Sequence, residues 1–366
     1  YKAYNVEVIN RNLPIWMTFE PGSTMKITTY TAAINEGLVN IFEDKFTDTG
    51  KINVDGATLH CWKRGGHGLQ TYLEVIENSC NTGFVSLGLM LQKEKLMEYI
   101  KELGFGKKTG IDLNGESTGI LFDINKMGNV ELATTAFGQG ISVTPIQQVR
   151  AVSAIVNGGT LYTPYIVKNF LEPETNTIIK SISPKGTKNI IKKETSELVK
   201  YALESVVAKG SGHNAYIENY RIGGKTGTAQ TVENGVYSNS KYILSFIGFM
   251  PADNPEIVLY IAVDNPKNVV QYGGVVAAPI AKNIFLSAID ILDIKQSNEG
   301  IAKEYTWLDQ KYVQVPDVVG KTLDEAKSLL KGFSIEYSGN GNKVIYTSPK
   351  SGTYTKEFGT IVLMLN

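Results

Sequence analysis

The spacing of apolar positions predicts helices through the first half of the chain. Apolar residues recur at helical intervals from Ser23 to about Leu103 and again over about 124–157. A polar, glycine-rich insert at about 45–70 interrupts the first of these two blocks. The first half is therefore expected to be largely helical, with one irregular insert.

A hairpin signal lies inside this insert. The runs Lys51–Val54 and Ala57–Cys61 flank the dipeptide Asp55-Gly56, which is typical of a two-residue turn between antiparallel strands. Because the length of the turn fixes how the two strands pair, Cys61 is expected to lie opposite Gly50.

The second half alternates between helix and strand signals. Helical spacing covers Glu194–Ala208, and a closing helix is predicted over Pro279–Leu292. Strands are predicted around Thr160–Lys168 and Thr177–Ser183 and through Tyr220–Val263. Helices followed by a sheet with flanking helices predict an α+β architecture that includes an all-helical subdomain.

A small second domain is expected at the end of the chain. Residues 293–311 are polar and charged, and 296–311 is interpreted as a linker between a domain over 1–295 and another over 312–366. The last segment carries a helical stripe formed by Leu323, Ala326, Leu329 and Leu330. Three strand runs follow, over Phe333–Tyr337, Lys343–Thr347 and Thr360–Leu365.

Composition adds limits to this picture. The 366 residues leave room for one large and one small domain. Because 36 basic residues balance 36 acidic ones, the charge gives no support for nucleic-acid binding. Since no uninterrupted apolar run reaches about 18 residues, no membrane-spanning helix is predicted, and no signal peptide is visible.

Three short motifs indicate a covalent active site. Each alone would more often be a helix cap, a turn or a glycine-rich loop. When all three occur in this order along a chain and are widely spaced, they are typical of enzymes whose own active-site serine becomes acylated. Such enzymes usually have Asp at the position of Cys80. The motifs are Ser23-Thr24-Met25-Lys26, Ser79-Cys80-Asn81 and Lys225-Thr226-Gly227.

The first motif supplies a nucleophile and a base. A serine hydroxyl needs a neighbouring base to attack at neutral pH. If Ser23 opens a helix after Pro21-Gly22, Lys26 lies one turn away on the same face. Burial and a second cation, Lys225, lower a lysine pKa. Lys26 is therefore predicted to be the general base, and Lys225 to hold a substrate carboxylate.

The second motif is expected to face the same site. In an extended segment, Ser79 and Asn81 point the same way and Cys80 points away. Ser79 is predicted to relay a proton between Lys26 and a leaving amine, and Asn81 to hold a substrate amide.

The third motif is expected to form a substrate-binding strand. Glycines surround Thr226 and include Gly227, which is typical of a strand that another backbone approaches closely. A peptide substrate is predicted to pair along the edge of this strand. The backbone N–H groups of Thr228 and Ser23 are candidate donors to a developing oxyanion.

At these residues the chain resembles the class B penicillin-binding proteins, the D,D-transpeptidases that cross-link bacterial peptidoglycan. The resemblance covers most of 11–295. The segments that carry it are Phe19–Lys26, Glu77–Asn81, Phe137–Gly140 with Thr144-Pro145, and Ile222–Gln230. It implies a transpeptidase fold similar to that of β-lactamases, an antiparallel sheet flanked by helices with an all-helical subdomain.

The resemblance also implies a reaction and its partners. Ser23 would be acylated by a peptidoglycan stem peptide of a lipid-linked precursor or of the wall, and by β-lactams. No cofactor is required for this chemistry. A membrane glycosyltransferase is the expected partner, at the extracytoplasmic face of the bacterial membrane. Full-length family members add an N-terminal membrane anchor and a pedestal domain, so both are expected to have been removed before Tyr1.

The end of the chain resembles a PASTA module, in which one helix packs on a three-stranded sheet. Val315–Gly320 followed by Thr322–Ala326 carries this resemblance. A transpeptidase with a single C-terminal PASTA module resembles the sporulation-specific branch of the family, which implies a role in cortex wall synthesis.

Two rival functions remain open at this point. A β-lactamase or D,D-carboxypeptidase uses a similar acyl-serine site, but no Glu-x-x-x-Asn element placed to activate a deacylating water is evident. A non-catalytic β-lactam- or peptidoglycan-binding sensor can keep all three motifs. Turnover of a peptide or thioester substrate would separate a sensor from an enzyme.

The only two cysteines lie near a histidine and form a candidate metal site. The spacing of Cys61, His67 and Cys80 suits zinc, which binds thiolate and imidazole. The hairpin register puts Asp48 diagonally next to Cys61 on one face, whereas His60 should face oppositely. A structural zinc, a disulfide and two unlinked thiols remain open from the sequence, as does any fourth ligand.

Overall fold

A three-stranded antiparallel sheet lies at the centre of the first domain. The computed structural model describes residues 11–233, 235–304, 312–356 and 359–366. In the sheet order β11-β10-β9, the strand β9 lies at an edge of the described sheet. The strands are β9 (Gly223–Glu233), β10 (Val236–Met250) and β11 (Ile257–Asp264).

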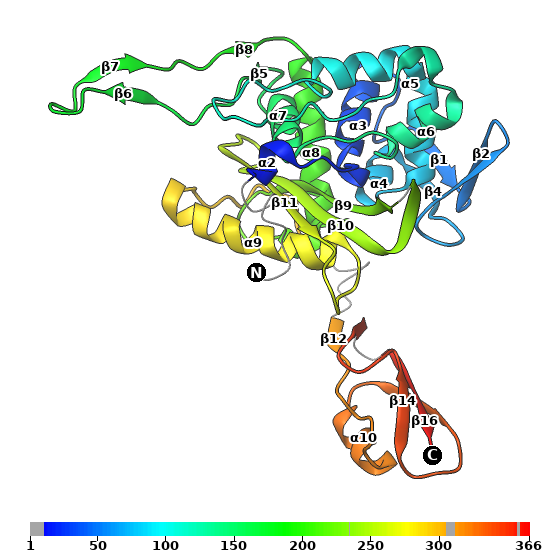
Figure 1. Cartoon of the computed structure of the whole chain (residues 1–366). Coiled ribbons are helices and arrows are strands. Elements are labelled where there is room, and N and C mark those ends of the chain that lie inside the picture. The colour runs from blue at the N-terminus through cyan, green and yellow to red at the C-terminus, as the bar shows by residue number, and fades with distance from the viewer. Residues whose placement is uncertain (1–10, 234, 305–311, 357–358) are drawn as a thin grey trace.

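Helices cover both faces of this sheet. The helix α9 (Gly273–Leu292) packs on one face, and α7 (Pro145–Val156) and α8 (Lys193–Ala208) pack on the other. Figure 1 shows the sheet between α9 and the helices α3 (Lys26–Asn35), α7 and α8. The predicted α+β architecture is confirmed.

The helix α9 begins earlier than expected. The sequence predicted a helix over Pro279–Leu292. The helix begins instead at Gly273, and Pro279 lies inside it. A Cβ on Gly273 would lie 2.2 Å from the Gly227 carbonyl oxygen, so a glycine is needed where α9 meets β9. The helix therefore begins at a tertiary contact that the local sequence does not reveal.

Among the described helices, α9 alone has the length and hydropathy of a membrane span. The sequence had predicted none, because Lys282 and Asp290 interrupt its apolar run. The helix packs on the sheet through Ala277, Ala281 and Phe285, which are buried, so it is a structural helix of this domain.

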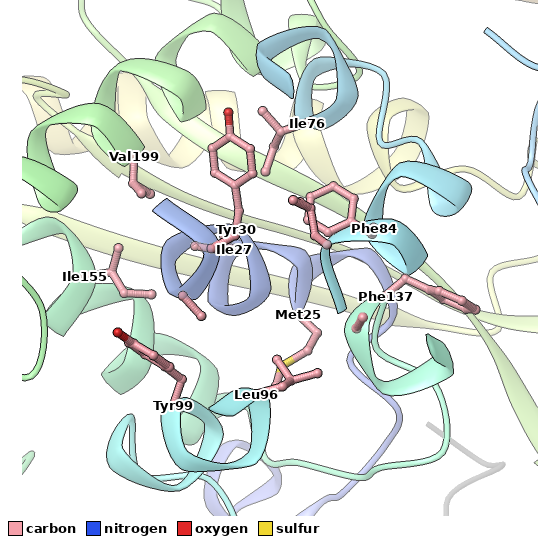
Figure 2. Packing of buried hydrophobic residues seen from close by; sticks show 14 of the residues in the cluster. Met25, Ile27, Tyr30, Ile76, Phe84, Leu96, Tyr99, Phe137, Ile155 and Val199 are labelled. Carbon is pink, nitrogen blue, oxygen red and sulfur yellow. The ribbon is translucent and has the colours of Figure 1, made fainter. Parts of the chain in front are cut away.

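The helix α3 forms the centre of the all-helical subdomain. Every residue from Lys26 to Ile34 is buried, as expected for a helix surrounded by others. Figure 2 shows Tyr30 beside Phe84, whose ring centroids are 6.2 Å apart. Burying one such aromatic side chain contributes about 2–3 kcal/mol of folding free energy. The helices around α3 include α4 (Tyr72–Glu77), α5 (Asn81–Glu102) and α6 (Asn129–Ala136).

The second predicted helical block is divided. Instead of one run over 124–157, a 3-10 turn precedes two α-helices, α6 and α7, which the segment 137–144 separates. Gly138 and Gly140 have positive φ there, a conformation that a helix does not contain. Gly138 lies so close to Gly22 that a Cβ would meet the Gly22 carbonyl oxygen at 2.0 Å.

The hairpin inside the insert is confirmed. The strands β2 (Lys51–Val54) and β3 (Ala57–His60) pair antiparallel around Asp55-Gly56. The Cys61 N–H donates to the Gly50 carbonyl at 2.9 Å, as the predicted register requires. The neighbouring strands β1 (Lys45–Asp48) and β4 (Gly68–Thr71) pair beside it.

A long arm projects from the first domain (Figure 1). The strand predicted over Thr160–Lys168 is reduced to two residues. Pro164 cannot donate a ladder hydrogen bond, and the Asp112 carboxylate accepts the N–H groups of Ile166 and Val167, each at 2.8 Å. The arm contains β5 (Leu161–Tyr162), β6 (Asn169–Leu171), β7 (Ile178–Ser181) and β8 (Gly186–Thr187).

Part of the predicted linker packs along the first domain. The Ser297 N–H donates to the Asn219 carbonyl at 2.9 Å, and the Glu304 N–H donates to the Ala208 carbonyl at 3.0 Å. Residues 305–311 of the predicted linker lie outside the described residues.

The C-terminal module has its own apolar core. The helix α10 packs on a sheet of order β13-β16-β14, as the resemblance to PASTA modules implied. The buried core residues are Val315, Val318, Ala326, Leu330, Val344, Ile361, Leu363 and Leu365. The elements are β12 (Tyr312–Gln314), α10 (Leu323–Leu329), β13 (Ser334–Ser338), β14 (Val344–Ser348), β15 (Tyr354–Lys356) and β16 (Thr360–Leu365).

Candidate active site

Ser23 is the accessible residue of a buried segment. Of residues 21–34, it alone is not buried. It was expected to open the helix, but it lies in a 3-10 turn (Gly22–Thr24), and α3 begins at Lys26. Because the turn runs directly into α3, Ser23 stays one turn from Lys26 while its side chain remains accessible to a substrate.

Lys26 joins the first motif to the second. Its side chain is fully buried, and its Nζ donates to the Ser79 carbonyl at 2.8 Å, to Ser79 Oγ at 3.2 Å and to Asn81 Oδ1 at 2.7 Å. An ammonium group has three N–H donors, and each finds an acceptor. These bonds hold the amine in one position next to the turn that carries Ser23.

The second motif reaches this arrangement by a different backbone path from the one expected. Ser79 has a φ of +51°, and Cys80 is the N-cap of α5, which begins at Asn81. The prediction of an extended segment is therefore wrong. Ser79 and Asn81 nevertheless both contact Lys26, while Cys80 is fully buried on the opposite side of the segment.

The third motif lies on β9 against the nucleophile turn. A Cβ added to Gly227 would lie 3.1 Å from the Thr24 methyl group, so the two motifs are in direct contact. Thr228 Oγ1 accepts the Gly273 N–H at 3.1 Å, which ties the motif to the start of α9.

Sequence reasoning missed one side chain beside this motif. Thr226 Oγ1 donates to Ser211 Oγ at 3.2 Å. Ser211 stands between two glycines, which is an ordinary loop pattern that gives no sign of such a contact.

Burial lowers the pKa of both active-site lysines. Burial lowers the pKa of Lys26 to about 8, although the nearby Cys80 and Cys61 oppose this shift. Burial and the charge of Lys26 lower the pKa of Lys225 well below its ordinary value. Lys225 Nζ donates to the Thr226 carbonyl at 3.1 Å. The pair therefore supplies one amine that can accept a proton near neutral pH and one cationic or donor group beside it.

A second cluster lies directly behind the second motif. Asp48, Cys61, His67 and Cys80 place one ligand atom each within 4.8 Å of all the others. Sequence reasoning named three of them as candidate ligands and gave Asp48 only as a neighbour. The exposed His60 does not belong to this group, as the strand alternation predicted.

The distances within the cluster resemble those around a tetrahedral ion. The two sulfurs are 3.9 Å apart, and Cys61 Sγ lies 3.5 Å from His67 Nδ1. Zinc with usual bond lengths would hold two sulfurs about 3.8 Å apart and a sulfur and nitrogen about 3.5 Å apart. Asp48 Oδ2 lies 3.4 Å from Cys80 Sγ and 2.7 Å from His67 Nδ1. The four side chains fit a zinc ion if the distance between Asp48 Oδ2 and His67 Nδ1 widens slightly.

Neighbouring groups orient the carboxylate of this cluster. Thr82 Oγ1 donates to Asp48 Oδ1 at 2.8 Å, and the Gly50 N–H donates to the same oxygen at 2.7 Å. Burial raises the pKa of Asp48, but these bonds and one from His67 outweigh it and lower that pKa below its usual range. Such outer contacts are typical of metal-binding carboxylates. The cysteines are unlinked, since a disulfide requires sulfurs about 2.05 Å apart.

Trp62 ties the cluster to the rim of the site. It directly follows Cys61, and its ring N–H donates to the Asn78 carbonyl at 2.9 Å. Its ring packs edge-on against Tyr272, with centroids 5.7 Å apart. Tyr272 directly precedes α9, so Trp62 connects the helical subdomain to the sheet side.

Comparison with known proteins decides the family. The chain matches the penicillin binding protein transpeptidase domain over residues 2–286 and the PASTA domain over residues 313–366. It belongs to the penicillin-binding protein transpeptidase family. The resemblance inferred from the sequence is thereby confirmed.

Relatives of this penicillin-binding protein include stage V sporulation protein D of Bacillus subtilis (strain 168). The two are 56% identical over 365 residues, which is 100% of this chain and 56% of the relative. The probable peptidoglycan D,D-transpeptidase PenA of Neisseria flavescens is 30% identical over 287 residues, covering 78% of this chain and 67% of the relative. The chain thus spans about half the length of the first of these relatives.

Solved structures of the family show the same fold. Penicillin binding protein 3 of Mycobacterium tuberculosis, in complex with aztreonam, matches with a TM-score of 0.73 and 28% identity, covering 82% of this chain and 70% of that one. The transpeptidase domain of Burkholderia pseudomallei penicillin-binding protein 3 matches with a TM-score of 0.70 and 29% identity, covering 79% and 84%.

Proposed function

We propose that this penicillin-binding protein is a peptidoglycan D,D-transpeptidase. The observation that carries the proposal is the buried Lys26 amine, held by Ser79 and Asn81 one turn from the accessible Ser23. A buried amine with a pKa of about 8 can accept the hydroxyl proton at neutral pH. The relatives named as D,D-transpeptidases support the same reaction.

Each motif residue then has a role in acyl transfer. Ser23 Oγ attacks the penultimate D-Ala carbonyl of a stem peptide while its proton passes to Lys26. The backbone N–H groups of Ser23 and Thr228 bind the oxyanion. Ser79 relays the proton to the departing D-Ala amine, which leaves an ester on Ser23. The amine of a second stem attacks that ester and releases the enzyme.

The remaining residues position the donor stem. Asn81 holds a substrate amide, and the stem pairs along the edge of β9 beside Gly227. Lys225 and Thr226 bind the terminal carboxylate, whose negative charge favours the protonated form of Lys225. This chemistry needs no cofactor, and β-lactams acylate Ser23 because they resemble the D-Ala-D-Ala end.

Replacing Ser23 by alanine tests the enzymatic part of this proposal. The wild-type protein should release D-alanine from a D-Ala-D-Ala peptide or turn over a thioester analogue, and Ser23→Ala should do neither while keeping its melting temperature. A wild-type protein that is acylated but never turned over would favour a peptidoglycan-binding sensor.

We further propose that the cluster of Asp48, Cys61, His67 and Cys80 holds a structural zinc ion. The near-tetrahedral separations and the outer contacts to Asp48 support it. Because Cys80 stands between Ser79 and Asn81, the ion would brace the loop that fixes Lys26. It would take no part in the acyl transfer itself.

The cellular setting is proposed from the relatives. The name of the Bacillus subtilis relative favours a role in sporulation wall synthesis. Stem peptides of a lipid-linked precursor would be the substrates, at the extracytoplasmic face of a membrane to which an N-terminal anchor attaches the protein. A membrane glycosyltransferase would supply the glycan strands that carry them.

A further inference from the structure

The arm that projects from the first domain has no core of its own. No residue from 162 to 190 is buried. Its strands β6 and β7 form a two-stranded sheet, and Figure 1 shows them at the far end of the arm. Large apolar side chains of these strands are between 47% and 63% exposed: Phe170, Leu171, Ile178 and Ile179. Because a two-stranded hairpin is only marginally stable in water, this end of the arm is a surface that a partner would stabilise.

The outer edge of β6 offers backbone groups to another strand. Lys168 and Glu172 each form a backbone hydrogen bond to the returning strand of the hairpin, at 2.9 Å and 2.8 Å. Because the direction of the backbone groups alternates along a strand, Asn169 and Leu171 point theirs the other way. The described part of the chain places no further strand on that side. Such an edge is a template for pairing with another chain.

Two neighbouring residues limit how far a second strand can pair along this edge. The Val167 N–H already donates to the Asp112 carboxylate at 2.8 Å. At the other end of β6, Pro173 has no N–H to donate. An added strand would therefore pair with a short segment centred on Phe170.

The charges on β6 indicate which strand fits there. Lys168 and Glu172 lie two residues before and two residues after Phe170, so the three side chains share one face of the strand. If a second copy of β6 pairs antiparallel about Phe170, Lys168 of each copy lies opposite Glu172 of the other. Within the part of the chain that the structure describes, neither side chain has an ion-pair partner. In the antiparallel direction, β6 is thus complementary in charge to itself.

The same register also satisfies the backbone and the apolar side chains. Asn169 of one copy lies opposite Leu171 of the other, and the two residues exchange both N–H···O bonds. Phe170 lies opposite its own copy as a non-hydrogen-bonded pair, in which Cα atoms are about 4.5 Å apart and side chains contact closely. The two rings then pack against each other between the two ion pairs. A twofold axis passes through this contact, as in most homodimers.

We propose that the arm joins two copies of this protein through antiparallel pairing of their β6 strands. The resulting sheet has the order β7-β6-β6-β7 across the twofold axis. Stable interfaces use about 20–30 residues on each side, and β6 offers far fewer. The dimer is therefore expected to be weak, with a dissociation constant on the order of 10–100 µM. The inference goes beyond the proposed function and does not depend on it, because the arm contains none of the motif residues.

Charge reversal tests the partner and the register together. Lys168→Glu places like charges opposite each other at both ends of the contact, and Glu172→Lys does the same. In sedimentation equilibrium, each variant alone should have a dissociation constant at least about tenfold higher than the wild-type protein. An equimolar mixture of the two variants should dimerise with nearly wild-type affinity, since every glutamate then faces a lysine of the other copy.

Lys185→Glu provides the matched control. This lysine is exposed on the same arm but lies outside β6, so its reversal should leave the dissociation constant unchanged. None of the three substituted side chains is buried, and all variants should therefore keep the melting temperature of the wild-type protein.

Three results would overturn the inference. The first is a wild-type protein that remains monomeric up to about 1 mM, tenfold above the weakest dissociation constant expected. The second is an equimolar mixture that binds no better than the single variants, or single variants that bind as well as the wild-type protein. The third is a loss of affinity in Lys185→Glu equal to that in Lys168→Glu, which would indicate a general effect of charge. None of these results bears on acyl transfer at Ser23.

Discussion

Replacing Lys26 by methionine is expected to lower the rate constant for Ser23 acylation by about a thousandfold, in the range typical of a lost general base. Methionine keeps the buried aliphatic stem but removes the amine that Ser79 and Asn81 hold. The measurement is the second-order rate constant for acylation by a chromogenic cephalosporin. The exposed Lys101 on α5 provides a control, and Lys101→Met should react like the wild-type protein.

The pH profile of the same reaction identifies the base. Lys26 can accept a proton only when neutral, and burial lowers its pKa to about 8. The wild-type rate should therefore rise as pH increases through about 8 and level off above it, whereas Lys26→Met should lack this rise. A variant that retained both the rate and the rise would assign the base to another group.

Removing zinc is expected to weaken folding and acylation together. If free zinc is about a thousandfold above its dissociation constant, binding stabilises the fold by about 4 kcal/mol. For a domain of this size, a chelator should then lower the melting temperature by roughly 10 °C. The acylation rate should fall as well, because Cys80 lies between Ser79 and Asn81, which hold Lys26.

Two variants distinguish the loss of zinc from a nonspecific effect of the chelator on the protein. Cys80→Ser should lose most of its bound zinc and its response to the chelator, whereas the exposed His60→Ala should keep both. Zinc content per chain is measured on the purified proteins. Unchanged melting temperature and acylation rate in the chelated wild-type protein would rule out the structural ion.

The sequence predicted those features of the site that depend on local chemistry. The order and residue types of the three motifs indicated acyl-serine chemistry before any fold was known. The Asp55-Gly56 turn fixed the hairpin register, and this register placed Asp48 beside Cys61. His67 and both cysteines were candidate ligands from the sequence, and the structure adds Asp48 as the fourth. The hairpin register does not determine the path of the loop that carries His67, so the contact between His67 and Asp48 could not be predicted.

Other features depend on contacts that the local sequence does not encode. The positive φ of Ser79 is unusual for serine, and it occurs in the three-residue connection, 78–80, between α4 and α5. The helix α9 begins at Gly273, where it contacts β9 and β10, whereas the predicted start was Pro279. Glu20 gains its partners Gly140 and Tyr237 from segments 120 and 217 residues away. No periodicity in the sequence reveals such distant pairings.

Incubating the protein with a fluorescent penicillin, and locating the modified residue by mass spectrometry, tests the acyl-serine site most directly. We expect one stable adduct, on Ser23, and none in Ser23→Ala. Rapid loss of the adduct would indicate a β-lactamase instead. A folded, zinc-loaded protein that forms no adduct, or forms it on another residue, would contradict the acyl-serine site.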